Sequence, residues 1–520
     1  MKKIRKIAAA ILTVSMIAGS LTGCAGATPN RNPSSSTAVS KGENASKVNS
    51  DDAPYQIDIE LLLGMPNPDL EEVEKAIDKI TMDKLNCTVK FREVNIADHA
   101  TQMNLLGTGS DKMDLVWCGY TTQPAQLKDS GILLGIGDLL NKNAPDLVKK
   151  CGKLLDGCRI GDDIYFVPTT LYPGVQKCFM YDKDTVNTYN IDIPENITEE
   201  PETGLEKFYE NVKNSDFGGY ASSMGDGFNA PVTLMPDNDV EPLGDTTTCS
   251  YGVLMNMDKD TTIVDLYETP EYEKTVRMIR DWHEKGYIVP DSLTNGTTLV
   301  DAVSSGQIVG SIAAVDVNYI GNMEKVTGKT YETIPFSDLS VSGSKMGEYG
   351  LAVTTASKNP EKVCQFLNLL YTDAELSNLM NYGIKGKHYV KKSEHIIDFP
   401  DGVNFGNLGY GNQICTFGDP MLNYQRAPFT EDYYKDLDNY SIDKCVVSKA
   451  FGYTFDISNV KTQAAAVSSV IGEYGPSLSC GVVDVDEKLP EFIQALKDAG
   501  IDDVIAENQK QFDAWLLTQK

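Results

Sequence analysis

The sequence lacks most of the short motifs that mark nucleotide chemistry, hydrolysis and metal binding. Its 520 residues contain no Cys-x-x-Cys pair, Walker A loop, Gly-x-Ser-x-Gly motif, His-Glu-x-x-His motif or EF-hand loop. Histidine is also scarce, with four in the whole chain. These absences remove the usual sequence support for zinc sites, P-loop nucleotide sites and serine hydrolases. We therefore expect no cofactor, no metal site and no catalytic residues.

Basic charge is low as well. The chain has 46 basic and 74 acidic residues, a formal net charge of −28. A nucleic-acid-binding protein needs a basic surface, and adhesion to anionic lipid needs one too, so both classes are disfavoured. The apolar share is an ordinary 41%, and a globular chain of this length is expected to form about three domains.

Long hydrophobic runs are confined to the N-terminus. Four basic residues within the first six precede the apolar stretch 7–21, which is shorter than the roughly 20 residues of a membrane span. This order is typical of a secretory signal. Leu21-Thr22-Gly23-Cys24 resembles a bacterial lipobox, which implies cleavage before Cys24 and a lipid on its thiol. We predict a signal peptide over 1–23 and a lipid-anchored, flexible tether over 24–54, which is rich in small and polar residues.

Ten cysteines follow Cys24. Export would permit disulfides. Cys87, Cys118 and Cys364 nevertheless lie in apolar runs, which favours buried free thiols. A Cys151–Cys158 disulfide remains open.

Hydrophobic periodicity predicts a mixed α/β body. Apolar residues alternate with polar ones at the start of 55–63, which is typical of a strand, and Asp69 three residues before Glu72 indicates a helix start. The same patterns predict further strands at 87–94, 114–118, 164–168, 176–181, 308–314 and 351–355, and helices at 97–106, 124–129, 138–149, 204–213, 270–285, 360–370 and beyond 456.

The first five elements alternate strand, helix, strand, helix, strand, as in a parallel α/β lobe. Ligands of such sheets bind beyond the carboxyl ends of the strands. We therefore expect the segments 65–67 and 119–122 to border a binding site.

Several segments together resemble a known family. Residues 282–291 (WHEKGYIVPD), 305–307 (SGQ), 357–391 and 452–456 (GYTFD) are similar to family 1 extracellular solute-binding lipoproteins, the receptors of carbohydrate ABC importers. Within that family they resemble the LipO- or LplA-like subgroup, which has an extra C-terminal helical domain. The resemblance implies a type II periplasmic-binding-protein-like fold, with two α/β lobes, a hinge and a helical extension.

This fold leads to a domain prediction in which each lobe is discontinuous. We expect lobe 1 to combine 55–170 with 297–345, lobe 2 to combine 171–296 with 346–430, and a helical module to cover 431–520.

A carbohydrate site needs aromatic side chains and a few oriented polar groups. Trp282 and Trp515 lie on apolar helix faces and are expected in the core. The candidate ligand-binding residues follow predicted strands or lie in the Tyr-Gly-Asn-Gln turn that resembles one in the subgroup. They are Asn67, Trp117, Tyr120, Tyr172, Asp316, Asn318, Tyr319, Tyr410, Asn412 and Gln413.

The sequence thus predicts a monomeric, non-enzymatic receptor at the outer face of the membrane. It would capture a carbohydrate, such as an oligosaccharide, and deliver it to the membrane subunits of an ABC permease. Two alternatives remain open: a receptor for a peptide or another polar solute, and a surface enzyme that processes glycans.

Overall fold

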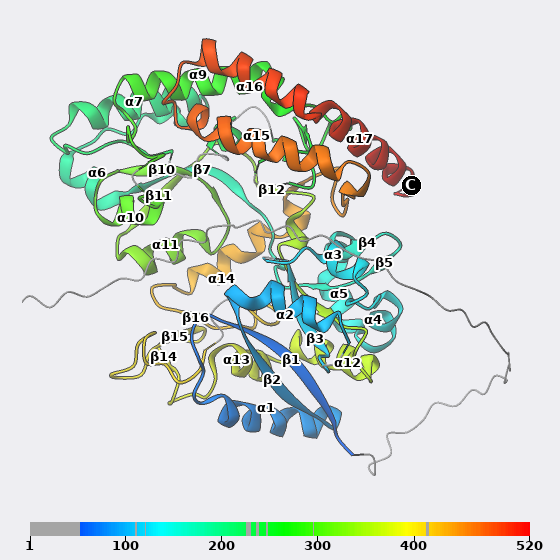
Figure 1. Ribbon diagram of the computed structural model, residues 1–520. Coiled ribbons are helices and arrows are strands. Elements are labelled where there is room, and N and C mark those ends of the chain that lie inside the picture. The colour runs from blue at the N-terminus through cyan, green and yellow to red at the C-terminus, as the bar shows by residue number, and fades with distance from the viewer. Residues whose placement is uncertain are drawn as a thin grey trace, which may run out of the picture. The chain divides into compact units, whose positions relative to one another are not determined.

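The computed structural model describes residues 53–109, 112–119, 121–224, 230–235, 239–245, 248–294, 296–411 and 415–519 (Figure 1). The chain divides into two units, Met1–Asp52 and Ala53–Lys520. The predicted signal peptide, the anchor at Cys24 and the tether up to residue 52 lie outside the described residues.

The first lobe is built on a five-stranded sheet with the order β2-β1-β3-β13-β6. The strands β1 (Tyr55–Leu63), β2 (Cys87–Asn95) and β3 (Leu115–Gly119) are parallel, as predicted. The strand β13 (Tyr349–Val353) runs antiparallel to β3 and to β6 (Val167–Pro168). The carboxyl ends of β1, β2, β3 and β6 therefore share one edge of the sheet with the amino end of β13.

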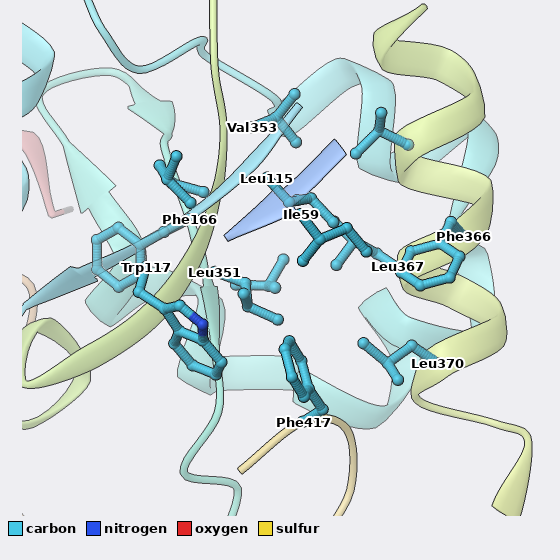
Figure 2. Close-up of a cluster of buried hydrophobic side chains, with 14 of the residues drawn as sticks. Ile59, Leu115, Trp117, Phe166, Leu351, Val353, Phe366, Leu367, Leu370 and Phe417 are labelled. Atoms are coloured by element: carbon cyan, nitrogen blue, oxygen red, sulfur yellow. The ribbon is translucent and has the colours of Figure 1, made fainter. Parts of the chain in front are cut away.

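Helices cover this sheet with apolar faces. In α12 (Pro360–Leu370), Pro360 occupies the first turn and the Asn359 side chain accepts the Lys362 N–H at 3.1 Å, so the helix start is capped. Figure 2 shows Phe366, Leu367 and Leu370 of this helix packing against the sheet residues drawn with them. The helices α1 (Leu70–Leu85) and α13 (Ala374–Tyr382) pack beside α12.

The second lobe contains a three-stranded antiparallel sheet of order β10-β7-β11. It comprises β7 (Gln176–Asp182), β10 (Gly310–Val315) and β11 (Tyr331–Pro335). The helices α7 (Pro201–Asn214) and α9 (Pro270–Glu284) supply its aromatic core. There the ring centroids of Tyr209 and Trp282 are 4.9 Å apart, and Trp282 is a core residue, as predicted.

These pairings correct the predicted division of the later segments between the lobes. From the sequence, 297–345 is predicted in lobe 1 and 346–430 in lobe 2. Strand β10 instead pairs with β7, whereas β13 pairs with β3. Hydrogen bonding between strands that are far apart in sequence decides this division, and local periodicity carries no information about it.

A C-terminal module follows, formed by α15 (Lys461–Ser479), α16 (Val485–Ala499) and α17 (Ile501–Thr518). Gly500 has φ +91° and separates the last two helices. The helices α15 and α16 pack against α9. The buried residues of the module include Phe492 and Phe512. Trp515 stacks on Phe512 with ring centroids 5.8 Å apart.

Two predicted elements divide. The single helix predicted over 138–149 is two helices, because Pro145 begins a new one, and the strand predicted over 164–168 is two short strands.

The remaining elements are short. The helices are α2 (His99–Leu106), α3 (Pro124–Asp129), α4 (Gly137–Asn143), α5 (Pro145–Cys151), α6 (Lys183–Tyr189), α8 (Ala230–Thr233), α10 (Leu299–Ser304), α11 (Tyr319–Thr327) and α14 (Asp432–Leu437). The strands are β4 (Arg159–Ile160), β5 (Asp163–Ile164), β8 (Glu241–Pro242), β9 (Val253–Leu254), β12 (Ser340–Val341), β14 (Val390–Lys391), β15 (Ile396–Asp398), β16 (Gln425–Arg426) and β17 (Val446–Val447).

The ten cysteines of the described chain are free thiols, and all but Cys445 are buried. Cys87, Cys118 and Cys364 are thus buried thiols, as predicted, and Cys151 and Cys158 form no disulfide. Among the described residues, no helix has both the length and the apolar character needed to cross a bilayer.

Candidate functional site

The loops at the shared edge of the first sheet meet closely. Gly119 ends β3 with φ +87°, and a Cβ built there would lie 2.2 Å from the carbonyl oxygen of Glu348. Only glycine lets the segment before β13 approach this strand so closely. The two mouth segments predicted from the sequence, 65–67 and 119–122, both follow strands that end at this edge.

Asn67 connects the first mouth segment to a distant loop. Its backbone N–H donates to Glu93 Oε1 at 3.2 Å, and its side-chain Oδ1 accepts the Gly411 N–H at 3.1 Å. The side chain is 5% exposed, and its Nδ2 has no hydrogen-bond partner among the described residues. Asn67 therefore holds the loop around residue 411 and keeps one buried donor unused.

His388 strengthens the same junction. Its Nδ1 accepts the Ile384 N–H at 2.9 Å, and its Nε2 lies 3.1 Å from Asp69 Oδ2. The Asp69 N–H in turn donates to the carbonyl of Gly409 at 2.9 Å. His388 is thus a structural hydrogen-bonding residue.

Two of the aromatic residues predicted to face ligand lie in the core. Trp117 is 2% exposed, and its ring centroid is 5.0 Å from that of Phe417 (Figure 2). Tyr410 is fully buried, and its hydroxyl donates to the carbonyl of Met380 at 2.6 Å. Both predictions are corrected, because residues distant in sequence cover these rings: Phe417 packs on Trp117, and His388 lies beside Tyr410.

A buried polar pair near this edge was missed. Glu60 and His99 are both fully buried, with Glu60 Oε2 3.4 Å from His99 Nε2. The Trp117 N–H donates to the same oxygen at 2.9 Å, and His99 Nδ1 faces the hydroxyl of Thr121. Glu60 Oε1 and His99 Nε2 have no hydrogen-bond partner among the described residues. Glu60 lies among buried apolar residues of β1. An acidic residue in such a strand is the sequence signal that could have indicated a buried polar site.

The chain crosses between the lobes in segments that pair with one another. Val175, after β6, and Ser340, in β12, exchange backbone hydrogen bonds of 2.9 and 2.8 Å. Strand β12 also pairs in parallel with β17, which precedes the C-terminal module. We call 169–175, 336–348 and 427–448 the crossing segments.

A second set of predicted residues gathers beside the crossing segments. Burial raises the pKa of Tyr433, in α14, and the neighbouring charges that raise it further include Asp316 and Tyr172. Burial, together with the Cys178 and Asp316 charges, likewise raises the pKa of Tyr440. Tyr172 and Asp316, which follow strands of different lobes, thus both act electrostatically on Tyr433. Tyr433 and Tyr440 are additions to the site, and neither is among the residues predicted from the sequence.

The other candidates on this side begin α11. Asp316 Oδ1 accepts the Asn318 N–H at 2.9 Å in the turn before the helix. Tyr319 packs against the small apolar cluster of Cys178, Ala313 and Val315. Asp316, Asn318 and Tyr319 are all partly exposed. Tyr120, Asn412 and Gln413, also predicted at the site, lie outside the described residues.

We call Tyr172, Asp316, Asn318, Tyr319, Tyr433 and Tyr440 the tyrosine site. It offers phenol rings and one carboxylate, which suits a polar ligand with apolar faces. The described residues contain no cluster of three or more His, Cys, Asp or Glu placed to hold a metal ion. A separate surface depression of about 340 Å³ is lined by α9 and α16 and includes none of these residues.

Comparison with known proteins gives matches over most of the chain. The family model described as bacterial extracellular solute-binding protein matches residues 67–376. A model described as a domain of unknown function (DUF3502) matches residues 449–517, which contain the C-terminal helices. A carbohydrate ABC transporter substrate-binding protein of Streptococcus pneumoniae is 24% identical over 531 aligned residues, with 100% of both chains covered.

Solved structures share the fold. The N-glycan transport solute binding protein NgtS of Streptococcus pneumoniae matches with a TM-score of 0.75 and 21% identity, covering 90% of this chain and 100% of that one. A solute-binding protein of Bifidobacterium longum infantis, described as binding HMO, matches with a TM-score of 0.60 and 15% identity, covering 89% and 100%. These likenesses show the two-lobed solute-binding fold with C-terminal helices.

Proposed function

Because this chain belongs to the bacterial extracellular solute-binding protein family, we propose that it captures an oligosaccharide and delivers it to an ABC importer. Family membership places its folded body outside the cytoplasm. The tyrosine site carries the proposal, since it lies where elements of both lobes approach the crossing segments.

The chemistry of the site suits a sugar. A sugar ring has apolar C–H faces and a rim of hydroxyls, so it binds between aromatic rings and a few polar groups. The partly exposed phenols of Tyr172 and Tyr440 supply ring faces, and the carboxylate of Asp316 accepts hydrogen bonds from hydroxyls. The full-length relative named as a carbohydrate transporter component supports the same class of ligand.

Capture depends on a difference between two states. Ligand that contacts both lobes stabilises the closed arrangement over the open one only if it binds the closed arrangement more tightly. The paired crossing segments are the elements that would bend. The closed, loaded receptor would then be recognised by the permease, which supplies the coupling to ATP hydrolysis.

The N-terminal sequence supports a lipid anchor. Cleavage before Cys24 and lipidation of its thiol would hold the receptor at the outer face of the membrane, and residues 25–54 would act as a tether. Mass spectrometry of the membrane-associated protein tests this directly. The mature N-terminus should be a diacylated or triacylated Cys24, and Cys24→Ala should release the protein into the medium.

A thermal-shift panel tests the ligand class. The chain carrying Cys24→Ala should be heated with oligosaccharides, peptides and amino acids. A ligand present at 100 times its dissociation constant stabilises the folded state by about 2.7 kcal/mol. We expect a shift with oligosaccharides and recovery of the intact sugar by mass spectrometry.

The alternatives predict different outcomes. A response to peptides with none to sugars would favour a receptor for another polar solute. Cleavage of the sugar would favour a surface enzyme.

A further inference from the structure

A pair of cations in this acidic chain has no carboxylate partner. Lys325 lies in the last turn of α11, and Arg426 ends β16. Neither forms an ion pair with a carboxylate among the described residues, although the chain has 74 acidic side chains. Arg426 is 7% exposed, and its buried Nη1 has no hydrogen-bond partner in the described chain.

Two phenylalanine rings lie against these cations. The Arg426 guanidinium carbon is 3.9 Å from the ring centroid of Phe399 and 6.0 Å from that of Phe405. The Lys325 ammonium is 4.5 Å from the Phe405 centroid. The two rings are perpendicular neighbours at 4.8 Å, and Phe405 is 44% exposed. Cation–π contacts hold the group together and leave Nη1 of the guanidinium without a hydrogen-bond partner among the described residues.

The local electrostatics favour an added negative charge. Burial lowers the pKa of Arg426. Desolvation and the charge of Arg426 lower the pKa of Lys325. The carboxylate that acts on Arg426 is Asp398, which pairs with Lys392 at 3.4 Å and accepts the Phe399 backbone N–H at 2.8 Å. A buried guanidinium and a nearby ammonium that repel each other gain stability when an anion joins them.

The position of the group connects it to the tyrosine site. The helix α11 carries Tyr319 in its first turn and Lys325 in its last. Phe429, three residues after the end of β16, packs against Gly321 in the first turn of α11. A Cβ added to Gly321 would lie 2.4 Å from the Phe429 ring. Lys325 thus belongs to the second lobe. Phe399 and Arg426 belong to the β15–β16 segment, which follows the helices of the first lobe.

We propose that Lys325, Phe399, Phe405 and Arg426 form a subsite for the carboxylate of an acidic sugar, such as a sialic or uronic acid residue of a glycan. The inference rests on the proposed function, because it specifies the substrate class of that receptor. A carboxylate matches the planar fork of the guanidinium in two parallel hydrogen bonds. The exposed face of Phe405 supplies an apolar surface for the sugar ring.

The test is calorimetric titration with three probes: a desialylated biantennary N-glycan, its sialylated form and free sialic acid. Charge-assisted hydrogen bonds predict that the sialylated glycan binds roughly ten- to hundredfold more tightly than the desialylated one. This preference should shrink between about 0.1 M and about 1 M salt, where the screening length falls from about 10 Å to about 3 Å.

Variants of both cations separate recognition from folding. Lys325→Gln changes an exposed side chain and should remove most of the preference while leaving the desialylated glycan unaffected. Arg426→Gln should abolish the preference, and Arg426→Lys should restore only part of it. Lys149→Gln, at an exposed lysine of α5, is the matched control and should change nothing.

The outcomes distinguish the two proposals. Equal affinity of the wild-type protein for the sialylated and desialylated glycans overturns the subsite. An equal loss of affinity for both glycans in the variants overturns it too. Failure of all three probes to bind overturns the receptor for such glycans and the subsite together. Binding of free sialic acid alone, lost in Lys325→Gln, supports the subsite and removes the oligosaccharide from the proposed function.

Discussion

Replacing Glu241 with Gln should change how the stability of the protein depends on pH. Glu241 lies in β8 with 1% of its surface exposed. Its Oε2 accepts the Gly343 N–H at 3.0 Å, and the Ser448 hydroxyl also hydrogen-bonds to the carboxyl group. Gly343 and Ser448 belong to two crossing segments, so this one side chain holds both.

Burial sets the size of the effect. It raises the pKa of Glu241 from 4.5 to about 8, against the opposing hydrogen bonds from Gly343 and Ser448. The folded state therefore keeps a proton that the unfolded state releases above about pH 4.5. Stability is lost as pH rises through this window, at about 1.4 kcal/mol per pH unit, or about 5 kcal/mol over the whole interval.

Glu241→Gln keeps a neutral acceptor of the same shape and removes the titration. The free energy of unfolding of the variant relative to wild type should thus rise by about 4–5 kcal/mol between pH 4.5 and pH 8.5. Urea unfolding at several pH values measures this difference. Asp265, whose pKa is raised to about 7 by burial, affects both proteins equally and cancels.

Glu473→Gln, at an exposed acid of α15, is the control and should show no such pH dependence. A difference between Glu241→Gln and wild type that stays constant across the pH range would refute the reasoning. It would mean that the carboxyl group is hydrated in the native state.

Three further perturbations follow from the geometry. Gly119→Ala should destabilise the fold by about 2 kcal/mol or more, because its φ is positive and the new Cβ would meet the Glu348 carbonyl; an unchanged urea midpoint would contradict this. Phe366→Ala, in the fully buried face of α12, should cost about 3–5 kcal/mol by the same assay, and a loss below 1 kcal/mol would argue against the packing. Among the described cysteines, Cys445 should react first with a thiol reagent under native conditions, since the others are buried, and rapid labelling of several thiols would contradict their burial.

Much of the local structure could be predicted from the sequence. The strand over 55–63 and the helix from Pro360 to Leu370 have periodic apolar residues and recognisable caps, so short-range pattern and sterics determine them. The break at Pro145 follows from the same local rules and was overlooked. Family resemblance supplied the two-lobed fold, which periodicity alone does not specify.

The assignment of segments to lobes and of side chains to faces could not be predicted in this way. All five residues of β3 are buried, because both faces of the sheet are covered, so no alternation reveals where Trp117 points. The pairing of β13 with β3 joins residues more than 200 positions apart. Glu60 also joins its site through a contact between separate strands: the backbone N–H of Trp117 in β3 donates to Glu60 in β1, 57 positions earlier.

The most direct test of the central claim is titration calorimetry of the Cys24→Ala chain with intact oligosaccharides, paired with mass spectrometry of the recovered sugar. The account predicts saturable binding of one oligosaccharide per chain, weakened when Tyr172 or Asp316 in the tyrosine site is replaced by Ala, with the sugar recovered unchanged. Peptide binding without sugar binding, or a cleaved sugar, would contradict it.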